Sequence, residues 1–162
     1  MLVALGPVGC GFHPLYGRTG GSESPAAADL AAIRVLGIED RAGQQLRNSL
    51  IQRLTPLGEP ATPRYVLDVK MYETLEGQAE SSDGKSTVGR MTLRCSYALS
   101  DIQTGKSLKM GTARSLASMR YLGPRYASVA AERDTEERVI TDMAEEIRSA
   151  LAAWFVSSRP AK

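Results

Sequence analysis

The sequence predicts an α+β fold, a two-layer sandwich in which a four-stranded, mainly antiparallel sheet carries two helices on one face. The first observation is the alternation of apolar and polar residues along 65–72 and 91–99, which is typical of strands with one buried face. The second is the recurrence of apolar residues on one helical face along 44–54 and 130–155. At 162 residues, the chain suits one domain with a single core.

The element order follows as β-α-β-β-β-α. A short strand near 33–38 is followed by a turn at Asp40 to Gly43 and by the first helix, which Pro56 and Gly58 end. Three consecutive strands should then pair antiparallel, and both helices should cover the same face of the sheet. The three strands are expected at 65–72, 91–99 and 107–118, the last with a bulge at Gly111. A polar tip over 77–89, with Asp83-Gly84 as its turn, joins the first two, and a tight turn over 101–106 joins the last two.

The composition excludes several function classes. Twenty basic residues face eighteen acidic ones, and no Lys/Arg block exists that would bind nucleic acid. His13 is the only histidine, so histidine-based triads and most zinc sites are excluded, and we expect no catalytic residue, metal or cofactor. Cys95 alternates with apolar neighbours, which predicts a buried strand residue and no disulfide with Cys10.

The N-terminal residues predict a lipid anchor. The uncharged apolar run from Met1 to Gly9 leads into Cys10, which is typical of a partial signal peptide and lipobox over 1–10, although Pro7 departs from the usual pattern. The alternative is an apolar N-terminus with an incidental cysteine. We expect a flexible tether over 11–31, a folded domain over 32–157 and a disordered tail over 158–162.

Four fragments carry a family resemblance. They read C-G-F-H-P-L-Y-G from Cys10, D-R-A-G-Q-Q-L-R-N-S-L from Asp40, P-R-Y-V-L-D-V from Pro63 and Y-A-S-V-A-A-E-R-D-T-E-E-R from Tyr126. In this order and spacing they resemble the LPS-assembly lipoprotein family LptE, also called RlpB, in its alphaproteobacterial form. The resemblance implies two helices packed on a four-stranded sheet, and no enzymatic activity.

The same resemblance implies a location and partners. Members of the family are anchored by lipid to the periplasmic face of the outer membrane, and the absence of Asp after Cys10 agrees with that location. They plug the lumen of the LptD outer-membrane β-barrel in a 1:1 complex and bind lipopolysaccharide. The alternatives are an auxiliary lipoprotein of a phospholipid or solvent transport system and an unrecognised periplasmic hydrolase.

Basic residues near one pole of the domain are the candidate lipopolysaccharide site. By resemblance these are Lys85 in the turn between the second and third strands and Arg133 near the start of the last helix. Lipid A phosphates accept charge-assisted hydrogen bonds from such side chains, and a helix N-terminus favours anions. The alternative is that both residues are ordinary solvated charges. Further candidates at the same end are Arg90, Arg120 and Arg125.

Overall fold

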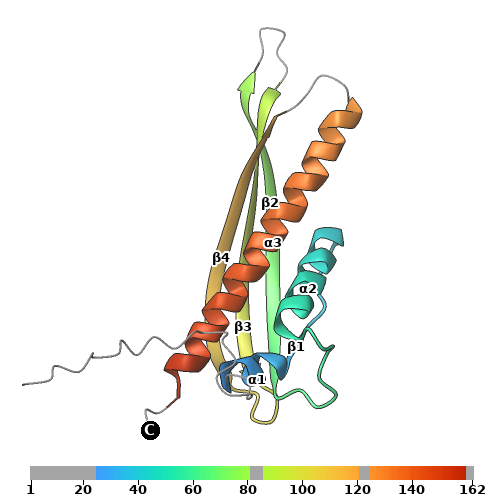
Figure 1. The fold of residues 1–162 in the computed structure, drawn as a ribbon. Helices are drawn as coiled ribbons and strands as arrows, with labels where there is room; N and C mark the ends of the chain where they lie inside the picture. Colours follow the sequence, from blue (N-terminus) through green and yellow to red (C-terminus); the bar gives the residue numbers. More distant parts are fainter. Residues whose placement is uncertain (1–24, 81–85, 121–124, 160–162) are drawn as a thin grey trace, which may run out of the picture.

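A four-stranded sheet with helices on one face forms the domain in a computed structural model, which describes residues 25–80, 86–120 and 125–159 (Figure 1). The predicted α+β sandwich is therefore confirmed. A helix that the sequence did not predict precedes the first strand. The elements are α1 (Pro25–Ala31), β1 (Ile33–Val35), α2 (Arg41–Leu54), β2 (Tyr65–Glu80), β3 (Ser86–Asp101), β4 (Ser107–Arg120) and α3 (Arg125–Ser157).

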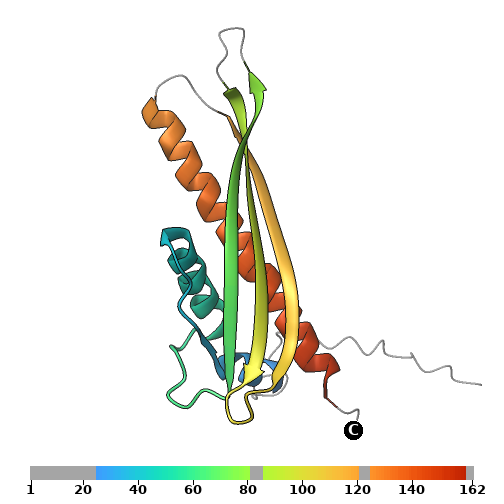
Figure 2. The same ribbon diagram turned by 180° about the vertical axis from the view of Figure 1, so that it is seen from behind.

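The strands lie in the order β1-β2-β3-β4. The short β1 runs parallel to β2, because α2 crosses over between them, and the other neighbours are antiparallel. Between β2 and β3 the ladder reaches Glu80 and Ser86, so most of the stretch predicted as a polar tip is strand; Asp83, Gly84 and Lys85 lie outside the described residues. The strands twist strongly along their length (Figures 1 and 2).

The core lies between the sheet and the helices, as the alternation in β2 and β3 predicts. Leu67, Leu93 and Leu99 of the sheet are fully buried, and so are Leu50 of α2 and Ile147 of α3. Cys95 is buried and free, which confirms its predicted place in the core. No helix of the described residues covers the other face of the sheet, which is the face seen in front in Figure 2.

Two segments expected to be loose belong to the folded domain. In α1, which falls within the predicted tether, Ala26 and Leu30 are buried against the core. Arg159, in the predicted tail, pairs with Asp29 and donates a hydrogen bond to the carbonyl oxygen of Pro25. Burial of apolar side chains and an ion pair therefore join the two ends of the domain.

Gly111 pairs in regular register with Tyr97, so the predicted bulge at this glycine is wrong, and the register shifts between Leu99 and Ser100 instead. The ring of Tyr97 lies over the Gly111 backbone. A Cβ atom at Gly111 would meet the Tyr97 ring at 2.4 Å, and this close approach is the physical reason for the glycine.

Candidate functional site

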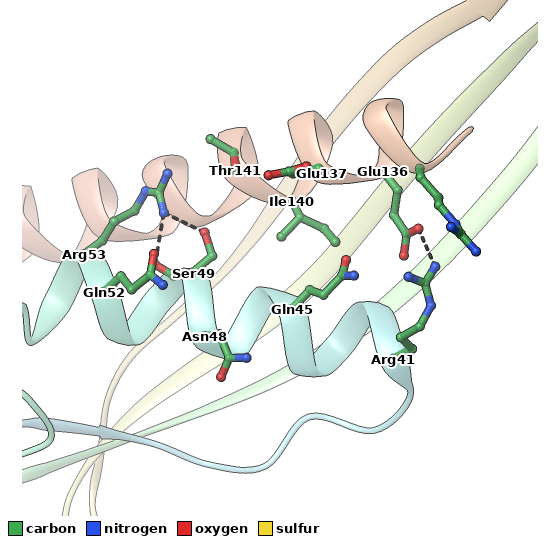
Figure 3. Close-up of a pocket in the computed structure, with 11 residues that line it drawn as sticks. Arg41, Gln45, Asn48, Ser49, Gln52, Arg53, Glu136, Glu137, Ile140 and Thr141 are labelled. Atoms are coloured by element: carbon green, nitrogen blue, oxygen red, sulfur yellow. Dashed lines mark hydrogen bonds and ion pairs between the residues drawn. The ribbon is translucent and has the colours of Figure 1, made fainter. Parts of the chain in front are cut away.

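A polar groove of about 540 Å³ runs between α2 and α3 (Figure 3). Both helices run in the same direction, and their facing polar side chains line it. One predicted site residue, Arg133, lies here together with residues that the sequence analysis did not single out. The residues of this interhelical groove are Arg41, Gln45, Asn48, Ser49, Gln52, Arg53, Arg133, Glu136, Glu137, Ile140 and Thr141.

An ion pair lies at the end of the groove where α2 begins. The Arg41 guanidinium donates a hydrogen bond of 2.6 Å to the carboxylate of Glu136. The Arg41 side chain is 66% exposed, whereas that of Glu136 is 8% exposed, so the pair holds a nearly buried charge at the groove wall. A buried carboxylate needs such a partner.

Glu73 of β2 lies close to this pair. Its pKa is raised above the ordinary value of 4.5, first by desolvation and then by the Glu136 charge, while Arg41 acts in the opposite direction. In the folded chain Glu73 therefore keeps its proton to a higher pH than in the unfolded chain. Its charge opposes folding above the folded pKa, and stability should rise as the pH falls from that value toward 4.5.

We therefore expect the substitution Glu73→Gln to raise the melting temperature at pH 7, because it removes a partly desolvated charge beside Glu136. The gain should disappear below about pH 4, where the carboxylate is protonated in both states. Thermal unfolding followed by circular dichroism across this range measures it. Glu76→Gln on the same strand is the matched control, and an equal gain for both variants would contradict the effect.

Further along the groove, Arg53 is already engaged. Its guanidinium donates to the Ser49 hydroxyl at 2.6 Å and lies 3.6 Å from a Glu145 carboxylate oxygen. Arg133, by contrast, is exposed and makes no ion pair within the described residues. Among the described residues that line the groove, Arg133 is therefore a cation without an ion pair, available to a phosphate or sugar ligand together with the polar side chains that line the same groove.

The predicted basic residues do not form one cluster in the described part of the chain. Arg90 and Arg120 lie on the helix-free face of the sheet, on β3 and β4, whereas Arg133 lies on α3 at the groove. Arg90 is half-buried, and its Nε atom is buried without a hydrogen-bond partner. Lys85 lies outside the described residues, as does the side chain of Arg125.

The place of Arg133 on its helix also differs from the expectation. Helix α3 begins at Arg125, not near residue 130, so Arg133 lies about 12 Å along the helix axis from its start. The helix dipole acts mainly within the first turn and does not reach Arg133. Arg125 occupies the N-terminal position that the sequence analysis gave to Arg133.

A second basic feature, which the sequence did not reveal, lies on the helix-free face. Arg94 and Arg114 are direct cross-strand partners, and Tyr72, which is 68% exposed, lies opposite Arg94 on the other side. Like charges in this arrangement are unfavourable unless an anion is nearby. Alternation along β3 could have placed Arg94 on this face, but its pairing with Arg114 depends on the register.

The described residues hold little that suggests chemistry. The pKa of the Cys95 thiol is raised to about 11 by burial, so the thiol stays protonated and unreactive at neutral pH. Within the described ranges, no group of three His, Cys, Asp or Glu side chains is placed to hold a metal ion. Of the helices described, none combines the length and the apolar character that crossing a bilayer requires.

Solved structures similar in fold come from several bacteria. A lipoprotein structure from Caulobacter crescentus CB15 is 21% identical and covers 82% of this chain and 97% of its own, with a TM-score of 0.67. A minor lipoprotein from Acinetobacter baumannii is 22% identical and covers 76% and 92%, with a TM-score of 0.61. Rare lipoprotein B from Shewanella oneidensis is 12% identical and covers 76% and 98%, with a TM-score of 0.54.

A comparison with curated proteins found no match. One family model, described as "LptE: Lipopolysaccharide-assembly", matches residues 30–151, which is well over half of the chain. This range runs from the end of α1 through the sheet and most of α3, and so includes both walls of the interhelical groove. The chain therefore belongs to the LptE family of lipopolysaccharide-assembly lipoproteins.

Proposed function

We propose that this protein is an outer-membrane lipoprotein, anchored through Cys10, that occupies the lumen of the LptD barrel in a 1:1 complex and binds lipopolysaccharide. The family match over 30–151 is the observation that carries the proposal. The family is not enzymatic and works in lipopolysaccharide assembly at the cell envelope, which removes the hydrolase alternative. A binding role agrees with a groove of hydrogen-bonding side chains.

The shape of the domain supports a position inside a barrel. Strands β2 and β3 have 16 residues each, and α3 has 33. These lengths correspond to elements of about 50 Å each, from about 3.3 Å per strand residue and 1.5 Å per helix residue. A long, narrow domain can lie along the axis of a barrel and present its helix-free sheet face to the inner wall.

Lipopolysaccharide binding is supported by basic residues that form no ion pair with the described part of the chain. Of these, Arg133 lies in the interhelical groove, and Arg90 and Arg120 lie on the helix-free face of the sheet. Each of these guanidinium groups can donate charge-assisted hydrogen bonds to a phosphate oxygen. We propose Lys85 and Arg133 as the principal contacts, with Arg90, Arg120 and Arg125 as additional ones.

The proposal is tested by purifying the tagged full-length chain from detergent-solubilised membranes and identifying its partners by mass spectrometry. We expect LptD in equal molar amount. Recovery of inner-membrane transporter components without LptD would instead support the transport-auxiliary function. In the same cells, fatty-acid labelling of the wild type but not of Cys10→Ser is expected, and equal labelling of both would exclude the anchor.

A further inference from the structure

We propose that the outer edge of β2 binds an extended, basic polypeptide segment as an additional strand. This β2 edge comprises residues 68–76. On that side β1 pairs only with Tyr65 to Leu67, and after Val35 the chain turns away toward α2. Figures 1 and 2 show β1 beside the lower end of β2 only. Within the described residues, most of this long strand therefore has no neighbouring strand on this side.

The backbone groups on this edge point away from β3. The Tyr65 N–H donates to the Ala32 carbonyl oxygen at 3.2 Å, and the Leu36 N–H donates to that of Leu67 at 3.0 Å. Backbone direction alternates along a strand, so Val69, Met71 and Glu73 present their N–H and C=O groups outward in the same way. A further strand can accept and donate these bonds, as in strand addition at sheet edges.

A groove of about 560 Å³ provides room for such a strand. The segment 37–40 and Ala42 form one wall, and residues 68–73 of β2 form the other. This edge groove begins where β1 ends at Val35, so an added strand would take the position beside β2 that β1 occupies further down. A segment of about six residues, about 20 Å long when extended, would reach from Val69 to Leu75.

The charges beside the edge indicate which sequences fit. Among the described residues that line the edge groove, Glu39, Asp40, Asp68 and Glu73 carry carboxylates and Lys70 carries a positive charge. Arg41, which also acts on Glu73, is paired with Glu136. Asp40 makes no capping hydrogen bond to α2, and none of the four forms an ion pair in the described part of the chain. A strand bearing Lys or Arg is therefore favoured. A second copy of this chain is disfavoured, because edge-to-edge pairing would bring these carboxylates together.

The outer edge of β4 belongs to a strand with basic rather than acidic side chains, and it serves as a comparison. Helix α3 crosses the sheet at an angle and packs against β4 (Figure 1), and the charged residues Lys109, Arg114 and Arg120 on this strand are basic. Gly111 and Ala113 pair with β3 residues whose backbone N–H and C=O groups point toward β4. Because backbone direction alternates along a strand, the N–H of Thr112 points outward at this second edge. Both edges can thus receive the same backbone substitution.

The test uses the full-length chain and two fluorescein-labelled octapeptides, one alternating lysine with threonine and one alternating glutamate with threonine. Fluorescence anisotropy at low ionic strength should show binding at least about tenfold tighter for the lysine peptide, because opposite charges pair across the edge. Hydrogen exchange measured by NMR should slow at the amides of Val69, Met71 and Glu73. Equal affinity for both peptides, or no slowing at these amides, would overturn the proposal.

Two proline variants distinguish backbone hydrogen bonding at the β2 edge from non-specific electrostatic attraction of the lysine peptide. Met71→Pro removes an outward donor without breaking the ladder to β3, since proline is tolerated where the N–H faces away from the sheet. It should weaken binding of the lysine peptide about tenfold, whereas Thr112→Pro should not change it. Equal weakening by both variants would overturn the assignment to β2. If Met71→Pro does not fold, Asp68→Lys with Glu73→Lys should reverse the peptide preference, and an unchanged preference would refute the proposal.

Discussion

Replacing Leu93 by alanine is expected to lower the free energy of unfolding by about 2–5 kcal/mol. Leu93 lies at the middle of β3, is fully buried and faces the helices. Its loss leaves a cavity that neither β2 nor β4 can close, because both are held to β3 by long ladders. This is a large share of the roughly 5–15 kcal/mol that stabilises a typical domain.

Urea unfolding followed by circular dichroism measures this change. Leu57→Ala is the matched control, because Leu57 is 96% exposed in the loop after α2 and should change stability by no more than about 0.5 kcal/mol. A loss below about 1 kcal/mol for Leu93→Ala would show that the core at β3 relaxes around the deletion. The comparison separates burial from the loss of a leucine side chain as such.

Reversing the charges of both Lys85 and Arg133 is expected to weaken lipopolysaccharide binding more than either single change. A charge-assisted hydrogen bond contributes about 1.5–3 kcal/mol, so each single reversal should cost at least about tenfold in affinity. Binding should also weaken with added salt, since exposed charges are screened. The fold should remain intact because Arg133 is exposed and has no ion pair among the described residues.

Titration of purified lipopolysaccharide against each variant measures these losses. Arg138→Glu is a suitable control, because Arg138 lies on the same helix but pairs with Asp134 at 3.3 Å and does not line the groove. If the double variant binds as well as the wild type at low ionic strength, these two residues are not the contacts. Association with LptD should be unaffected, so the result is distinct from the barrel proposal.

Local periodicity in the sequence was enough to predict the strands, the helices α2 and α3, and the buried face of each of these elements. Alternation placed Leu67, Leu93 and Cys95 in the core, and helical spacing did the same for Leu50 and Ile147. These predictions succeeded because each element buries one face, and the spacing of the apolar residues on that face can be recognised within about ten consecutive residues. The element ends were less accurate: β2, β3 and α3 extend several residues beyond the apolar pattern.

Contacts between distant segments could be found only in the tertiary structure. The approach of Arg41 to Glu136, the pairing of Arg94 with Arg114, and the edge of β2 beyond β1 depend on crossover and register. The small residues of α1 were read as a tether, since Ala26 and Leu30 reveal a buried face only when the core is present. A sequence pattern therefore determines which face of an element is buried, whereas packing determines which polar groups meet on the other faces.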